Sequence, residues 1–215
     1  MKRIERYSMD VDDYPYSHHV PMDLRGGVRT YVDVDSLPIS DKQKALVLSV
    51  QGLDTKKEQY CLAHHKDKQG RLLVTIKGLG ELDGYRVDLL SGKVYDASGR
   101  HEVKPVYHRN KAGQPMYLRL SGSRIDLHRI VALTWLRISG QLSLLDQAME
   151  NPSAYPAHHR EPWLKLSQRG NNVFNVEILP AKVHYQYESI VTQLAAKYKR
   201  GEVNIDKSSE IIVFD

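Results

Sequence analysis

The stretch that decides the fold runs from Ala157 to Glu188 and reads AHHREPWLKLSQRGNNVFNVEILPAKVHYQYE. Two adjacent histidines, His158 and His159, open it, and an asparagine-rich segment ending at Asn175 follows them. A basic loop, REPWLKLSQRG at 160–170, separates the pair from that segment. We therefore expect the histidine pair to lie on a β-hairpin.

An amphipathic helix is predicted directly after Pro180, because proline is well tolerated in the first helical turn. The helix is expected to run to about Lys199, with Gly201 as its stop. His184 falls in the first turn, and Glu188 follows one turn later on the same face. The apolar stripe has the spacing of one helix face: Val183, Tyr187, Ile190, Val191, Leu194 and Tyr198.

Upstream of the hairpin, the pattern predicts short strands and then two helices. Asp126 is an expected N-cap for a helix with an apolar face from Leu127 to Trp135, which Gly140 ends. A second helix is expected over residues 142–149. Apolar runs bounded by turn residues predict short strands or short apolar elements at 44–50, 71–76, 85–89, 93–95, 116–120 and 211–214.

The composition indicates a soluble globular protein with an excess of positive charge. The 215 residues are 41% hydrophobic, and the formal net charge is +5. Such an excess favours a polyanionic partner, because contacts with phosphates release counterions. No apolar run approaches the roughly 20 residues of a membrane span, and the N-terminus lacks the apolar segment of a secretory signal. Cys61 is the single cysteine, which excludes an internal disulfide and fits a cytoplasmic location.

The ordered set of histidines and asparagine suits the hydrolysis of a phosphodiester. That reaction needs a base to deprotonate water, a cation to offset developing negative charge, and a geometry that holds both. A histidine titrates near neutral pH and suits the first role. Histidine, asparagine and carboxylate side chains can hold the cation. Glu188 is a candidate second ligand from the helix, the alternative being an exposed helix carboxylate.

Several short motifs occur in a fixed order along the second half of the chain. They are YRVDLLSGKV at 85–94, KP at 104–105, LHRIVALTW at 127–135, NP at 151–152, HH at 158–159, NNVFNVE at 171–177, and His184. In this order they resemble the phage-type HNH endonucleases (His-Me finger, ββα-metal), with an upstream NUMOD-type module as in many homing endonucleases. The resemblance covers about half the chain. The chain departs from the family at Arg160-Glu161-Pro162, where Asp-Gly is usual, and in a longer loop after the histidine pair.

The resemblance implies a role for four residues. His159 matches the general base, and His158 matches a metal ligand beside it. Asn175 matches the amide that braces the hairpin loop and orients the base, and His184 matches the metal ligand on the helix. The implied cofactor is one divalent metal ion, Mg²⁺ in the first place, with Mn²⁺ or Zn²⁺ as alternatives.

Basic side chains near the predicted site are candidates for holding the substrate backbone, and the alternative is that they are solvated surface charges. These candidates for DNA binding are Arg124, Arg129, Arg160, Lys165 and Arg169. His128 is expected to pack or cap at a helix start, with contact to the active site as the alternative. Trp163 either stacks on a base or covers a small core.

Two other histidine pairs compete with the predicted site. His64-His65 precedes Lys-Asp and a glycine, a local match to the family, but no asparagine-rich segment and no ligand-bearing helix follow it. His18-His19 likewise lacks downstream partners. Both are expected to lie on the surface.

The sequence predicts an α+β fold in four segments. Residues 1–80 form a strand-containing region of unknown role, 81–125 a NUMOD-like β region, 126–200 the HNH ββα-metal nuclease module, and 201–215 a C-terminal tail. The expected function is metal-dependent hydrolysis of DNA that nicks one strand. The protein is expected to be a monomer or homodimer. Its expected location is the cytoplasm, which is the host cytoplasm if a phage encodes the protein. An inactive HNH-fold DNA- or protein-binding factor of phage origin and an RNA-cleaving enzyme stay open as alternatives.

Overall fold

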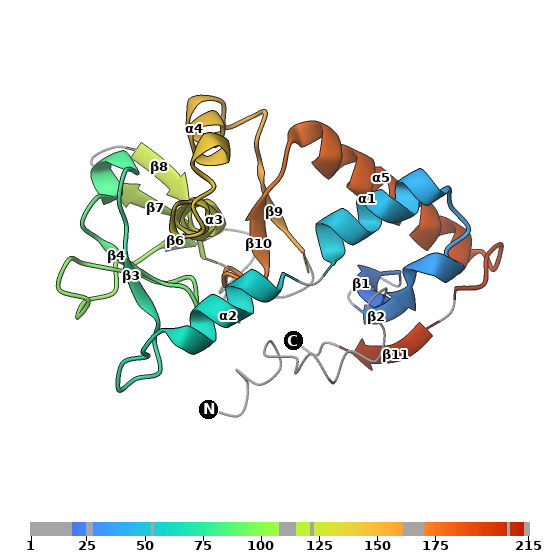
Figure 1. Ribbon diagram of the computed structural model, residues 1–215, viewed down its shortest axis with the longest axis horizontal. Coiled ribbons are helices and arrows are strands. Elements are labelled where there is room, and N and C mark those ends of the chain that lie inside the picture. Colours follow the sequence, from blue (N-terminus) through green and yellow to red (C-terminus); the bar gives the residue numbers. More distant parts are fainter. Residues whose placement is uncertain are drawn as a thin grey trace. The chain divides into compact units, whose positions relative to one another are not determined.

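The protein has a mixed α+β architecture built from small antiparallel sheets and several helices (Figure 1). A computed structural model describes residues 19–24, 28–52, 54–107, 115–120, 123–160, 170–205 and 207–212. The chain divides into two compact units, one formed by residues 1–58 and 182–215 and the other by residues 59–181. The four segments predicted from the sequence stay a prediction.

The first unit combines both ends of the chain. Strands β1 (His19–Asp23), β2 (Val28–Asp33) and β11 (Lys207–Ile212) form an antiparallel sheet in the order β1-β2-β11. Strand β11 includes residues 211 and 212 of the strand that was expected at 211–214. Residues 213–215 lie outside the described part. A short 3₁₀ turn, η2 (Val34–Ser36), leads from β2 towards the first helix.

Helix α1 (Asp41–Gln51) corrects the strand-like interpretation of the apolar run at 44–50. Ser40 caps the helix through a reciprocal capping box with Gln43, which satisfies orphan N–H groups of the first turn. Val47, Val50 and Gln51 are buried, the spacing of a helix face rather than a strand. The capping box at Ser40 therefore predicts the structure of this segment better than its run of apolar residues does. The following helix α2 (Thr55–Ala63) crosses the boundary between the two units.

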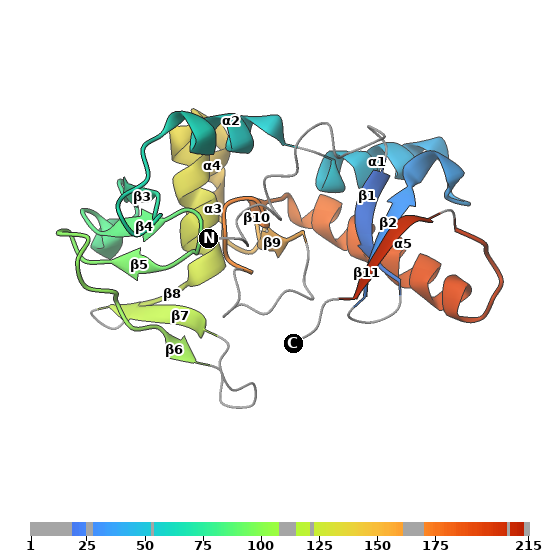
Figure 2. The same cartoon turned by 90° about the horizontal axis from the view of Figure 1, so that it is seen from below.

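The second unit contains two three-stranded antiparallel sheets (Figure 2), in which four strands fall on the predicted runs and the other two, at 106–107 and 123–126, were not predicted. One consists of β3 (Leu73–Thr75), β4 (Arg86–Asp88) and β5 (Val94–Tyr95), with the 3₁₀ turn η3 (Gly80–Leu82) between β3 and β4. The other consists of β6 (Val106–Tyr107), β7 (Pro115–Leu120) and β8 (Ser123–Asp126).

Helix α3 (Leu127–Ile138) is the centre of this unit, because it contacts β7, β8, β9, β10 and α4. Asp126 stands at the N-cap position with extended backbone but makes no side-chain capping bond, and it pairs with Arg124 instead. Gly140 ends the helix with φ of 73°, a conformation that favours glycine. Helix α4 (Leu142–Glu150) follows as expected.

The predicted hairpin is formed by β9 (Ala157–His159) and β10 (Val176–Ile178), which pair antiparallel. In this register His158 lies opposite Glu177, and His159 lies opposite Val176. Helix α5 (Ala181–Lys199) begins three residues after β10, and Gly201 follows it with φ of 71°. No helix in the described part of the chain is both long and apolar enough to pass through a membrane.

Candidate active site

The hairpin turns the two histidines of β9 in different directions. Successive side chains of a strand point to opposite faces, and the burial follows that rule, since His158 is 3% exposed whereas His159 is half-buried. The pair is therefore divided between two environments. One imidazole faces the interior side of the strand, and the other faces a cluster of polar and aromatic groups described below.

His159 contacts two side chains from other elements of the second unit. Its Nε2 lies 3.0 Å from Oδ1 of Asn171, which belongs to the loop before β10. Its ring centre lies 4.7 Å from the ring centre of His128, at an interplanar angle of 37°. Burial lowers the pKa of His159, and the contact with Asn171 opposes that shift. A lowered pKa keeps the imidazole neutral, the form that accepts a proton.

His128 lies in the first turn of α3 and packs against His159, so it lies beside the predicted base. Burial in the first place, and then the neighbouring His159 and Arg129, lower the pKa of His128 to about 3. His128 is therefore a neutral imidazole throughout the physiological pH range.

Asn175 joins the two ends of the loop between β9 and β10. Its side-chain Nδ2 donates to the backbone carbonyl of Gly170 at 2.8 Å. Its backbone carbonyl accepts from the backbone N–H of Arg160 at 2.9 Å. Its backbone N–H donates to Oδ1 of Asn172 at 3.0 Å. Both asparagines are 2% exposed, so these bonds are shielded from competing water. The geometry is that of a brace across the loop.

The helix-borne residues lie at the start of α5, which short backbone contacts anchor beside the hairpin. The Leu179 N–H donates to the Pro156 carbonyl at 3.2 Å, and the Ala181 N–H donates to the Ala154 carbonyl at 2.8 Å. His184 and Glu188 follow on successive turns, with His184 half-buried and Glu188 exposed.

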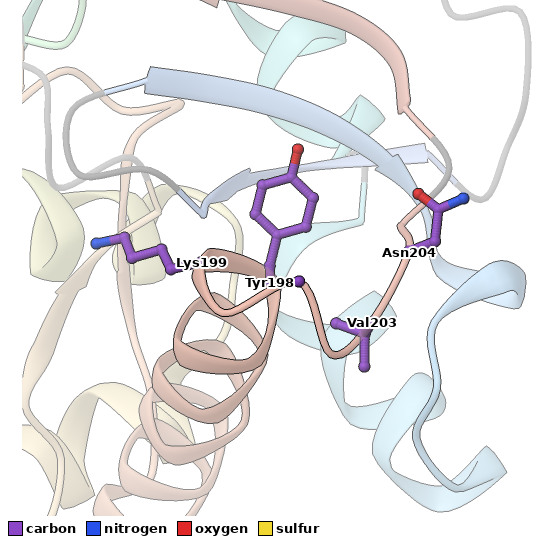
Figure 3. Close-up of a pocket in the computed structure, with 5 residues that line it drawn as sticks. Tyr198, Lys199, Val203 and Asn204 are labelled. Atoms are coloured by element: carbon purple, nitrogen blue, oxygen red, sulfur yellow. The ribbon is translucent and has the colours of Figure 1, made fainter.

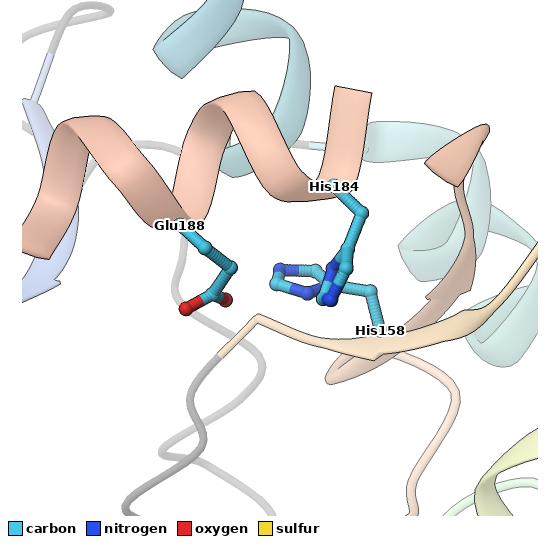
Figure 4. A group of neighbouring side chains, drawn as sticks. All are labelled: His158, His184 and Glu188. Atoms are coloured by element: carbon cyan, nitrogen blue, oxygen red, sulfur yellow. The ribbon is translucent and has the colours of Figure 1, made fainter. Parts of the chain in front are cut away.

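Candidate ligand atoms of His158, His184 and Glu188 all lie within 4.8 Å of one another. Figure 4 shows the two imidazoles and the carboxylate turned toward a common point. Two imidazole nitrogens and one carboxylate oxygen are three donors, the number that catalytic zinc sites use while keeping a position open for water or substrate. Imidazole nitrogens and carboxylate oxygens are both groups that can bind divalent metal ions.

The candidate substrate-binding residues have different surroundings. Arg124 is exposed, pairs with Asp126 at 3.4 Å and lies over the ring of Tyr117. Arg129 donates to the backbone carbonyls of Tyr155 and Ala148, so these N–H groups tie α3 to the segment before the hairpin. Arg160 is half-buried at the end of β9. Trp163, Lys165 and Arg169 lie outside the described residues.

The competing histidine pair at the end of α2 has local contacts. Both His64 and His65 are exposed. Nδ1 of His64 lies 2.8 Å from the Tyr60 carbonyl, and its ring stacks on Tyr60 at 3.8 Å. Of the pair at the N-terminus, His18 and the side chain of His19 lie outside the described part.

An open hollow of about 550 Å³ lies in the first unit and is lined by Tyr198, Lys199, Gly201, Val203 and Asn204 (Figure 3). These side chains offer one cation and several neutral hydrogen-bonding groups. None of the predicted site residues lines this hollow, and its lining does not supply a base beside a ligand set.

Sequence reasoning missed Asn171 as the partner of His159. The Asn171-Asn172 doublet was visible as part of the asparagine-rich segment, but nothing local told which asparagine reaches the base. Comparison of the chain with models of protein families, with curated proteins and with solved structures finds no match.

Proposed function

We propose that the protein is a metal-dependent endonuclease that hydrolyses phosphodiester bonds in DNA, with the β9–β10 hairpin and the start of α5 forming an HNH ββα-metal site. The observation that carries this proposal is the juxtaposition of two sets of groups. His158, His184 and Glu188 place three potential ligand atoms within 4.8 Å of one another, and the next residue along β9, His159, is a neutral imidazole with a defined polar partner.

His159 acts as the general base. Its lowered pKa leaves the imidazole unprotonated at neutral pH, so it accepts the proton of the attacking water. Asn175 supports the base from the facing end of the loop, since its backbone carbonyl accepts from the N–H of Arg160, the residue after His159, and its side chain bonds to the Gly170 carbonyl. The water oxygen attacks phosphorus, the bond to the 3′ oxygen breaks, and the leaving oxygen takes a proton from solvent water, which leaves a 5′-phosphate and a 3′-hydroxyl.

His158, His184 and Glu188 are the residues that would hold the metal ion. When bound, the ion stabilises negative charge on the phosphoryl and leaving oxygens. The two imidazoles favour Mn²⁺ or Zn²⁺ over the Mg²⁺ expected from the resemblance. The exposed position of Glu188 leaves this side of the ligand set open to solvent and to substrate.

The distribution of charge supports a nucleic-acid substrate. The unit of residues 59–181 carries 17 Lys and Arg against 11 Asp and Glu, a formal net charge of +6. The other unit carries 14 against 15, a net charge of −1. The positive excess is thus confined to the unit that holds His158 and His159, where it attracts phosphates.

A second candidate is a nucleic-acid-binding factor that has the same fold without the chemistry. The replacement of the family's Asp-Gly by Arg160-Glu161-Pro162 favours it, because this change places a basic residue at the end of β9. The neutral base beside three potential ligands favours the enzyme, since a binding factor has no need for that arrangement.

Relaxation of a supercoiled plasmid tests the proposal. The chain is freed of metal with EDTA and then supplied with Mn²⁺, Zn²⁺ or Mg²⁺, and a folded RNA is treated in parallel. Nicking of the plasmid that needs added metal supports the proposed function. Plasmid binding without cleavage under every metal contradicts it and favours the binding factor, whereas cleavage of RNA alone keeps the site and changes the substrate.

A further inference from the structure

We propose that Asn171 is the positioning residue that makes Nδ1 the basic nitrogen of His159, and that the β4–β5 turn holds Asn171 in place. The catalytic consequence rests on the proposed function. The hydrogen-bonding state of His159 does not depend on the proposed function, because that state follows from the geometry of the folded chain.

The orientation of the Asn171 amide sets the direction of the hydrogen bond between the two side chains. Oδ1 of Asn171 lies 3.0 Å from Nε2 of His159, and an amide oxygen accepts hydrogen bonds but does not donate them. Nε2 of His159 therefore carries the hydrogen. In a neutral imidazole the other nitrogen then holds the free lone pair, so Nδ1 is the atom that takes a proton from water.

Asn171 is fixed by a close approach of the turn between β4 and β5. Gly92 has φ of +73°, and a Cβ added there would lie 2.5 Å from the Asn171 carbonyl oxygen and 2.6 Å from the Asn171 Cβ. Only glycine fits at this distance. Two residues after Asn171, the Val173 N–H donates to the carbonyl of Leu89, directly after β4, at 2.8 Å. The loop before β10 therefore contacts the β4–β5 turn on both sides of Asn172.

His128 restricts the same imidazole by direct ring contact. Its ring centre lies 4.7 Å from that of His159, and both rings are at least half-buried. A half-turn of His159 about its Cβ–Cγ bond would exchange the positions of its ring edges, and the packed His128 ring opposes that rotation. Asn171 therefore selects the protonated nitrogen, while His128 keeps the ring in place.

Nitrogen NMR of the full-length wild-type chain tests the assignment without any cleavage assay. Long-range proton–nitrogen correlations distinguish protonated from unprotonated imidazole nitrogens, and comparison with His159→Gln identifies the signals of His159. The expected result is a protonated Nε2 and an unprotonated Nδ1, both in the metal-free chain and with Zn²⁺ added. A hydrogen on Nδ1, or an equal mixture of both forms, overturns the proposal.

Variants connect this state to the reaction. Asn171→Leu removes the acceptor and is expected to abolish the preference for Nε2–H and to lower kcat about 10- to 100-fold with little change in KM. Asn171→Asp restores an acceptor and is expected to keep both the preference and most of the activity. Asn204→Leu, at an exposed asparagine of the other unit, is the matched control and is expected to behave as the wild type.

Gly92→Ala leaves every side chain of the site intact and tests the support of Asn171. It is expected to disturb the His159 signals and reduce kcat in the same direction as Asn171→Leu. Unchanged His159 signals in both variants, with their folds retained, contradict the inference. If the chain cleaves no nucleic acid at all, the wild-type NMR result still decides it, so failure of the proposed function and failure of this inference are distinct.

Discussion

The two histidine pairs of the described chain show how the same dipeptide acquires different surroundings. His158-His159 lies on a hairpin strand, where Asn171 and His128 contact the ring of His159, and potential ligand atoms of His184 and Glu188 lie within 4.8 Å of one in His158. His64-His65 lies at the end of α2, exposed, with the His64 contacts made four residues away at Tyr60.

The difference teaches that a histidine pair becomes a candidate site through the partners that the fold delivers. Asn171 lies 12 residues beyond His159 in the chain, and His184 and Glu188 lie further still, so the dipeptide itself does not distinguish the two pairs and only the residues downstream of each pair do. Among the described residues, His158 joins a group of three potential ligands, whereas His64 and His65 join none. Matched substitutions in the two pairs therefore test this contrast.

The largest expected effect is loss of cleavage in His159→Ala, because the variant lacks the base that takes the proton from water. The rate is expected to fall about 10²- to 10⁴-fold, while binding to DNA is retained. His65→Ala, the matched change in the exposed pair, is expected to leave the rate unchanged. Plasmid nicking measured for both variants checks the contrast, and equal rates would remove the distinction between the pairs.

Metal affinity is expected to separate the pairs next. His184→Ala removes a ligand and is expected to weaken Mn²⁺ or Zn²⁺ binding by more than about 10- to 100-fold, the usual cost of losing a ligand's hydrogen-bond partner. Glu188→Gln is expected to have a smaller effect, since its amide keeps an oxygen donor at an exposed position. Calorimetric titration measures both, with His64→Ala as control. Loss of binding in the control alone would move the metal site to α2.

A smaller effect is expected from Asn175→Ala, because that side chain braces the hairpin loop. Removing its bond to the Gly170 carbonyl leaves a buried acceptor unpaired and is expected to lower the free energy of unfolding by about 1–3 kcal/mol. Urea denaturation checks this value. Asn204→Ala, at an exposed position, is expected to have the wild-type free energy of unfolding. If Asn175→Ala also unfolds with the wild-type free energy, the side chain of Asn175 contributes little to stability.

The smallest effect concerns pH and stability. Folding lowers the pKa of His128 from 6.5 to about 3, mainly through burial, so below pH 6.5 the unfolded chain binds a proton that the folded chain does not. Stability is expected to be complete above that pH and to fall as the pH is lowered. The charged or titratable neighbours that also lower this pKa are His159 and Arg129.

Thermal unfolding between pH 5 and pH 7.5 checks this direction. His128→Gln is expected to flatten the dependence of Tm on pH, whereas His65→Gln should follow the wild type. An unchanged dependence in His128→Gln would show that folding does not hold His128 neutral.

The helices of the site were predictable, because they carry strong local signals. The apolar stripe after Pro180 and the glycine at 201 predict α5 nearly to the residue, and the pattern after Asp126 does the same for α3. The run at 44–50 was misinterpreted because its apolar residues are nearly continuous, and the deciding feature is the capping box at Ser40.

Long-range pairings were not predictable from the sequence alone. The sheet that joins β11 to β2 brings together segments from opposite ends of the chain, and no local period encodes that pairing. The partnership of Asn171 with His159 likewise depends on how the loop folds against Gly92. Local patterns thus predicted which residue types matter, and the three-dimensional arrangement decided which of them meet.

The most direct measurement of the central claim is anomalous diffraction from crystals of the full chain soaked with Mn²⁺. We predict one ion bound by His158, His184 and Glu188, with His159 close by but not a ligand. An ion bound at His64 or His65 instead, or no ion at the hairpin at a Mn²⁺ concentration that supports cleavage, would contradict it.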